Sequence, residues 1–127
     1  MTEFPIREFH IHLYGPATSD RRDRRTPPIP TSFESAMERL QTDLSRVLLE
    51  PDGSLAWAGQ DFRLVGMLYD AASQIQYVEL RGTCRRHQLR RLVETVAGFR
   101  EIDDFAVMEL PQRQWKDFQS FANQLPE

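Results

Sequence analysis

Residues 63–82 read RLVGMLYDAASQIQYVELRG, and this stretch decides the fold class. Two runs of strand-forming residues, RLVGMLYD at 63–70 and IQYVELRG at 75–82, lie on either side of the short segment AASQ. Runs rich in Val, Ile and Tyr that are separated by a few small or polar residues are typical of a β-hairpin. The sequence therefore predicts two antiparallel strands in the middle of the chain.

A further strand is expected at residues 8–14, where apolar and polar side chains alternate and so lie on opposite faces. The apolar positions are Phe9, Ile11 and Leu13, and the polar or aromatic ones are His10, His12 and Tyr14. Residues 15–30, GPATSDRRDRRTPPIP, follow the strand. We expect them to form a flexible Arg- and Pro-rich loop, because X-Pro steps resist helix and the charged residues and prolines leave nothing to bury.

The first helix is expected to begin at Thr31, which forms a capping box with Glu34. Apolar residues then recur at helical spacing until Pro51 ends the helix. They are Phe33, Ala36, Met37, Leu40, Leu44, Val47 and Leu48.

The second half of the chain predicts two more strands and two more helices. The strands are LAWAG at 55–59 and the apolar FAVMEL at 105–110. A helix is expected at 84–97, with Gly98 ending it. A last helix is expected from Pro111, a residue that suits a first helical turn. Its apolar stripe is Trp115, Phe118, Phe121, Ala122 and Leu125.

Without the short 55–59 strand, the predicted elements follow the order βαββαβ, with a helix added at the C-terminus. This order predicts an α+β fold, a ferredoxin-like split βαβ sandwich in which helices cover one face of an antiparallel sheet of about four or five strands. A chain of 127 residues is expected to form a single domain, residues 1–127.

Composition narrows the function classes. The net charge of −3 does not favour nucleic acid as a partner. Cys84 is the single cysteine, which excludes an internal disulfide and a cysteine-rich zinc site. No apolar leader or membrane-length apolar run is visible, so no membrane partner and a cytoplasmic location are expected. We recognise no complete catalytic motif and expect no cofactor.

The sheet face away from the helices is the first candidate surface. The alternation places His10, His12 and Tyr14 on it, together with Tyr77, Glu79 and Arg81, and Trp57 is expected to join them. Aromatic and Arg side chains are enriched at protein interfaces. A homodimer interface is therefore expected, while a ligand surface and a solvated face remain alternatives.

His10 and His12 are also a weak candidate metal site. Residues two apart on a strand point to the same side, as a chelate requires, but zinc, nickel or iron needs further ligands. Glu79, Asp70 and His87 are the candidates for them.

The second candidate site is RGTCRRHQLRR, residues 81–91, which contains no acidic residue. With Thr83 as the expected N-cap, Arg85 and Arg86 fall in the first helical turn. An anion placed there would bind free N–H groups and guanidinium groups. The candidate anion ligands are Arg81, Arg85, Arg86, Arg90 and Arg91. The alternative is that acidic neighbours pair with these arginines.

The third candidate is Cys84 with His87. A thiol at a helix N-terminus beside arginines is expected to have a lowered pKa, and a nearby histidine is a conceivable base. The glycine-rich loop of a phosphatase is absent between them, so the pair is a weak catalytic candidate.

Taken together, these features favour a small non-enzymatic binding module that forms a homodimer through its open sheet face. The alternatives are a metal- or ligand-binding enzyme that uses His10 and His12, and an anion or nucleic-acid binder that uses the 81–91 patch. The sequence names neither a substrate nor a partner.

Overall fold

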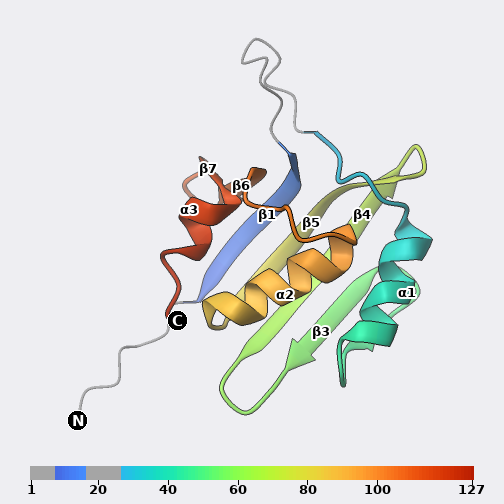
Figure 1. The fold of residues 1–127 in the computed structure, drawn as a ribbon, viewed down its shortest axis with the longest axis horizontal. Helices are drawn as coiled ribbons and strands as arrows, with labels where there is room; N and C mark the ends of the chain where they lie inside the picture. Colours follow the sequence, from blue (N-terminus) through green and yellow to red (C-terminus); the bar gives the residue numbers. More distant parts are fainter. Residues whose placement is uncertain (1–7, 17–26) are drawn as a thin grey trace.

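The computed structural model describes residues 8–16 and 27–127, which form one seven-stranded antiparallel sheet and three helices (Figure 1). The strands are β1 (Phe9–Pro16), β2 (Leu48–Leu49), β3 (Ser54–Ala58), β4 (Arg63–Ala71), β5 (Gln74–Thr83), β6 (Phe105–Glu109) and β7 (Gln114–Asp117). The helices are α1 (Phe33–Asp43), α2 (Arg86–Ala97) and α3 (Phe118–Ala122). The predicted α+β class is confirmed.

The strands lie in the order β2-β3-β4-β5-β1-β6-β7. The predicted hairpin is confirmed, because β4 and β5 pair antiparallel along their whole length. β1 pairs with both β5 and β6, so the N-terminal strand lies inside the sheet. The sheet has seven strands rather than the predicted four or five, since β2 and β7 were not expected.

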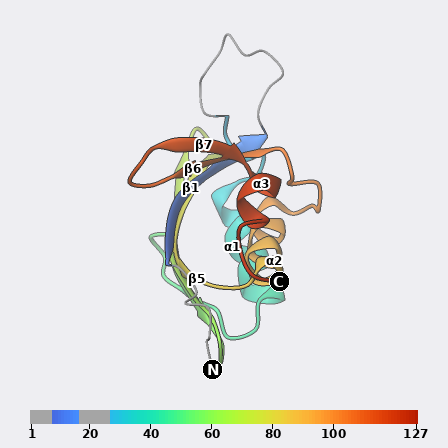
Figure 2. The same ribbon diagram turned by 90° about the vertical axis from the view of Figure 1, so that its left-hand side faces the viewer.

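The helices all lie on one side of the sheet, and the sheet curves around them (Figure 2). Their apolar side chains form a core with one face of the strands, including Ile11 and Leu13 from β1 and Val78 and Leu80 from β5. None of the helices in residues 8–16 and 27–127 covers the opposite face, which we call the open face.

The predicted capping box of the first helix is wrong. Ser32 is the N-cap of α1, and its hydroxyl accepts from the backbone N–H of Ser35 at 3.1 Å. α1 ends at Asp43, earlier than predicted. Leu48 is not helical but belongs to β2, where it pairs with Ala56 of β3. The apolar spacing at 44–48 fits both a helix and a return to the sheet, and the strand pairing decides between them.

Only part of the predicted 15–30 loop lies within the described residues. Residues 27–30 run along the sheet, where the Ile29 N–H donates to the Ile75 carbonyl at 2.8 Å and the Ile29 side chain is buried in the core. The expectation that this loop leaves nothing to bury is wrong at Ile29. Residues 17–26 lie outside the described residues.

The predicted long C-terminal helix is also wrong. Residues 114–117 form β7, a hairpin partner of β6 in which Trp115 pairs with Met108. α3 begins only at Phe118, with the Asp117 carboxylate accepting from the Ser120 N–H at 2.7 Å. Trp115 therefore lies on a strand and not in a helical stripe.

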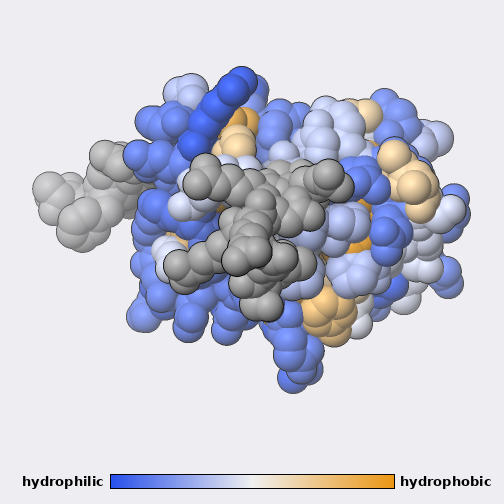
Figure 3. Space-filling view, turned by 90° about the horizontal axis from the view of Figure 1, so that it is seen from above, coloured by the Kyte–Doolittle hydropathy of each residue, from blue (hydrophilic) through white to orange (hydrophobic). Residues whose placement is uncertain are grey.

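The second predicted helix is confirmed with a small shift, because α2 begins at Arg86 and ends before Gly98, whose φ of 86° is the left-handed conformation that glycine favours. No helix among the described residues is long and apolar enough to cross a membrane. On the face shown in Figure 3, apolar residues form small groups between hydrophilic ones.

Candidate metal centre on the open sheet face

The register of the strands brings the polar residues of the open face into two rows. In the first, His12 on β1 lies opposite Glu79 on β5, and Glu79 lies opposite Met67 on β4. In the second row, His10 lies opposite Arg81. These side chains share a face because residues directly opposite on paired strands point to the same side.

Glu79 is the centre of this arrangement. Its Oε2 lies 2.7 Å from Nε2 of His10 and 3.7 Å from Nε2 of His12, and its Oε1 accepts from the Tyr69 hydroxyl at 3.3 Å. The carboxylate is about two-thirds covered, with a side-chain exposure of 31%. Glu79 on β5 thus joins two imidazoles from β1 and one phenol from β4, the strands on either side of it.

Arg81 determines which nitrogen of His10 carries the proton. Its Nη2 lies 3.4 Å from Nδ1 of His10, and a guanidinium can only donate. Nδ1 therefore accepts in this arrangement, and the protonated Nε2 donates to Glu79.

The pKa values in the cluster follow from burial and from these contacts. The hydrogen bond from His10 is the largest cause that lowers the pKa of Glu79, against the opposing effect of burial. Burial lowers the pKa of His12, although the charge of Glu79 opposes this. Glu79 is therefore ionised at neutral pH and His12 is neutral.

His10, His12 and Glu79 also meet the geometric condition for a metal centre. One ligand atom from each of the three residues lies within 4.8 Å of the others. We call these three residues the His-His-Glu cluster. Asp70 and His87, the other ligands considered from the sequence, are not members of it.

Aromatic rings continue from the cluster across the open face. The His12 ring lies 4.9 Å from Tyr77, and Tyr77 lies 4.5 Å from Tyr69 in a stacked arrangement. Tyr14 contacts both Tyr77 and Trp115, each at a centroid distance of 5.4 Å. The predicted placement of Tyr14 and Tyr77 on this face thus agrees with the structure.

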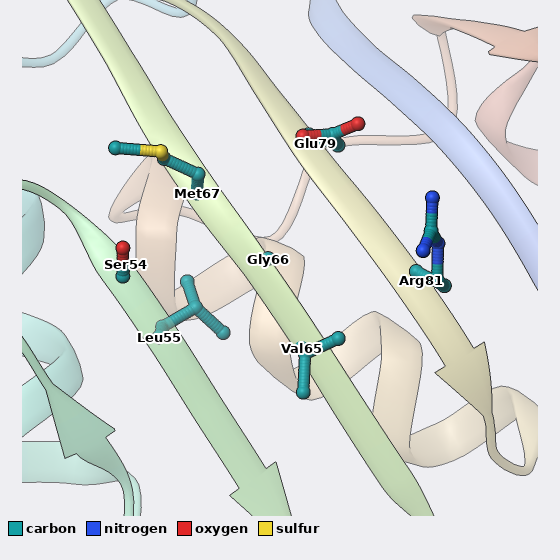
Figure 4. A pocket seen from close by; sticks show the side chains of 7 residues that line it. All are labelled: Ser54, Leu55, Val65, Gly66, Met67, Glu79 and Arg81. Carbon is teal, nitrogen blue, oxygen red and sulfur yellow. The ribbon is translucent and has the colours of Figure 1, made fainter.

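A shallow groove of about 380 Å³, whose lining side chains are drawn in Figure 4, shares Glu79 with the cluster. Its lining residues are Ser54, Leu55, Val65, Gly66, Met67, Glu79 and Arg81. Gly66 lies where β4 passes close to β5, since a Cβ there would stand 2.1 Å from the Glu79 carbonyl oxygen. Glu79 belongs to both the groove and the His-His-Glu cluster.

The other arginines of the 81–91 patch have partners within the chain. Arg85 donates to Asp61 and to the Glu127 carbonyl, Arg86 to the Ala122 carbonyl, Arg90 to Asp103, and Arg91 to the Asp43 carbonyl. The N-cap of α2 is Arg85 and not Thr83, and the Gln88 side chain accepts from its N–H at 2.7 Å. The predicted alternative, pairing with acidic neighbours, is thus observed for Arg85 and Arg90, and all four guanidinium groups have acceptors within the chain.

The expected lowered pKa of Cys84 is wrong. The side chain is buried in the core, and burial raises the pKa of the thiol to about 12. His87 is exposed on α2. A thiol that stays protonated at neutral pH is a poor nucleophile, so this pair does not support covalent catalysis.

Some residues of the site were not singled out from the sequence, and one was misplaced. Val65, Met67 and Tyr69 alternate along β4 onto the open face, a signal that was present in residues 63–70. Trp57 points instead into the core, where it is 8% exposed and donates to the Ser45 carbonyl at 3.2 Å.

Comparison of the chain with family models, curated proteins and solved structures gives no significant match.

Proposed function

We propose that this protein binds a divalent transition-metal ion through His10, His12 and Glu79. The observation that carries the proposal is the convergence of two imidazoles and one carboxylate within 4.8 Å on an accessible sheet face. The strands position all three ligands, so the site is largely formed before an ion arrives.

The ligand spacing is close to what an ion requires. Metal–ligand distances of about 2.0–2.2 Å in a tetrahedral arrangement separate the ligand atoms by about 3.3–3.6 Å. Oε2 of Glu79 lies 2.7 Å from Nε2 of His10 and 3.7 Å from Nε2 of His12, so one distance is below this range and the other is just above it. Small side-chain rotations therefore suffice to form the site.

The donor types select the class of ion. Imidazole nitrogen suits zinc, copper, iron and nickel, whereas calcium and magnesium prefer oxygen ligands. Three protein ligands leave at least one coordination position free, the arrangement that catalytic zinc sites share. Tyr69 supports the site from outside by its hydrogen bond to Glu79.

The test is calorimetric titration of untagged, chelator-treated protein with ZnCl₂. We expect a single Zn²⁺ ion to bind per chain. Glu79→Gln keeps the shape of the side chain but removes its charge, and we expect this change and His12→Ala each to weaken binding by about 100-fold or more, since even outer partners contribute about 10–100-fold.

The chain offers a matched control in its third histidine. His87→Ala removes an exposed imidazole from α2, outside the cluster, and we expect it to leave zinc affinity unchanged. Weak, unsaturated binding to the wild-type protein, or equal losses in His87→Ala and His12→Ala, would reject the proposal. Circular dichroism of each variant separates loss of the site from loss of the fold.

A homodimer through the open face is a second candidate. The large apolar side chains that remain exposed among the described residues are Leu48, Val65 and Trp115. The register places all three on the open face, because Leu48 and Val65 both lie opposite Ala56 and Trp115 lies opposite Met108. Leu48 and Val65 form one apolar patch on either side of Ala56, and Trp115 with Tyr14 forms a second toward the opposite edge of the sheet. Exposed apolar patches on one face favour a contact surface. The curvature of the sheet around the helices ranks this candidate second, because two convex faces meet over a small area (Figure 2).

We also infer that the four central strands form a ferredoxin-like core with α1 and α2. The support is their antiparallel order, β4-β5-β1-β6, with α2 between β5 and β6 in the chain and with α1, followed by β2 and β3, between β1 and β4. On this interpretation β2, β3 and β7 are additions at the two edges of the sheet.

A further inference from the structure

We propose that the groove beside the His-His-Glu cluster binds a small aliphatic carboxylate, whose charged end lies between the bound metal ion and Arg81. The inference rests on the proposed metal site and identifies the class of ligand that completes it. Three observations support it: the shared residue Glu79, the position of Arg81, and the apolar wall of the groove.

The first observation is that the ion site and the groove are continuous. Glu79 is a member of the cluster and also lines the groove. A coordination position left free by the three protein ligands therefore lies beside a space of about 380 Å³. This volume is within the range of about 300–1,000 Å³ that is usual for small-ligand sites.

The second observation is the position of Arg81. It lines the groove and donates to Nδ1 of His10. An ion that coordinates Nε2 of His10 takes the place of the proton there, so Nδ1 then carries the proton and no longer accepts from Arg81. Ion binding therefore frees the guanidinium for another acceptor.

The local charge determines the sign of that acceptor. Imidazoles that coordinate an ion are neutral, and the charges of the Glu79 carboxylate and the Arg81 guanidinium cancel, so a bound divalent ion leaves the site with two uncompensated positive charges. An anion compensates this charge, and a carboxylate also fits the two parallel donors of a guanidinium. Without the ion, Glu79 beside Arg81 disfavours an anion.

The third observation is the wall of the groove opposite Arg81. Val65 on β4 lies directly across from Arg81, is 39% exposed, and is followed by Met67 across from Glu79 (Figure 4). Ser54 on β3 lies beyond Met67. A ligand that starts at Arg81 on β5 and ends over Val65 and Met67 on β4 crosses one strand spacing, about 4.7–4.9 Å. A short branched aliphatic chain suits this apolar path.

The probe is 4-methylpentanoate, titrated calorimetrically into the zinc-loaded protein. We expect saturable binding to the wild-type protein and to Arg100→Gln, which removes an exposed arginine outside the groove. We expect Arg81→Gln to bind the probe at least about tenfold more weakly, through loss of a charge-assisted pair. The probe is titrated at a ZnCl₂ concentration that saturates each variant, so that Arg81→Gln, which keeps all three ligands, is compared with its ion site filled.

Two related compounds test the two ends of the ligand. We expect 4-methylpentanamide, which lacks the charge, not to bind, and acetate, which lacks the chain, to bind about tenfold more weakly than 4-methylpentanoate. Equal affinities of acetate and 4-methylpentanoate would overturn the role of the groove.

Zinc binding is measured first, so that failure of the metal site can be told apart from failure of the carboxylate site. Zinc binding without any carboxylate binding overturns this inference and leaves the metal site intact. Absence of zinc binding overturns the metal site, and the inference with it. Equal carboxylate binding with and without zinc overturns the placement of the anion at the ion.

Discussion

The buried thiol of Cys84 gives a prediction at the scale of one residue. Its side chain has no exposed surface, and burial raises the pKa of the thiol to about 12. Thiolate is the reactive form, so we expect a thiol reagent to label the folded protein at pH 8 only as fast as the structure opens. Labelling should be complete within mixing time in denaturant.

An exposed cysteine serves as the control for this labelling. Thr42 lies exposed on α1, so Thr42→Cys in a Cys84→Ala background should react at once in the native state. Rapid stoichiometric labelling of native wild-type protein would contradict the buried position.

The raised pKa of Cys84 also makes the stability of the fold depend on pH, because the pKa of the thiol in the folded protein lies above its unfolded value of about 8.5. The free energy of unfolding therefore decreases as the pH rises from about 8.5 toward 12.

The candidate site was predictable only in part, because the sequence shows which face of the sheet a residue lies on but not which residue of the next strand it pairs with. The period-two alternation predicts which side chains share a face, and it assigned His10, His12 and Glu79 correctly to the open face. It does not determine register, which here pairs His12 with Glu79 across 67 positions of sequence. The contact of Glu79 with both imidazoles depends on that long-range pairing, and no local pattern contains it.

At the scale of elements, Arg39 joins the two long helices. From α1, its Nε donates to the Thr95 carbonyl at 2.9 Å, and its Nη2 donates to the Val96 carbonyl at 2.6 Å and to Oγ1 of Thr31 at 2.6 Å. The two carbonyls belong to the last turn of α2, where they have no partner in their own helix. A positive charge at a helix C-terminus is favourable in addition.

We expect Arg39→Met to lower the free energy of unfolding by about 2–3 kcal/mol, because methionine keeps much of the apolar packing but leaves the carbonyls without a donor. Urea denaturation followed by circular dichroism measures the change. Arg100→Met, at an exposed position, should change stability by less than about 0.5 kcal/mol. Equal effects of the two substitutions would show that the contact between the helices contributes little.

The elements that were predicted correctly are those with one strong local signal. The hairpin at 63–82 has two long strand-forming runs, and α2 has a five-residue apolar stripe with Gly98 at its end. The helix prediction for residues 111–117 was wrong. Pro111 and the apolar spacing that includes Trp115 fit a helix, but pairing with β6 makes residues 114–117 a strand. Short edge strands such as β2 depend on a neighbour that the local sequence does not specify.

At the scale of the whole molecule, the two proposed occupants of the open face compete. A second copy that contacts both Val65 on β4 and Trp115 on β7 would also cover the His-His-Glu cluster, which lies on the strands between them. Ion binding and self-association through this face therefore use the same surface.

The homodimer candidate predicts that sedimentation equilibrium of the 14.9 kDa chain shows a dimer at high protein concentration. Trp115 is 49% exposed, so Trp115→Glu should convert this dimer to a monomer by placing a charge in its apolar contact. Gln112→Glu adds the same charge at an exposed position of the β6–β7 hairpin and should leave the dimer intact. At a protein concentration at which both proteins are monomers, Trp115→Glu should bind zinc with the wild-type affinity, because Trp115 contacts Tyr14 and is not one of the three ligands. A wild-type protein that stays monomeric at every concentration would reject the homodimer and leave the open face accessible to the ion and to the carboxylate beside it.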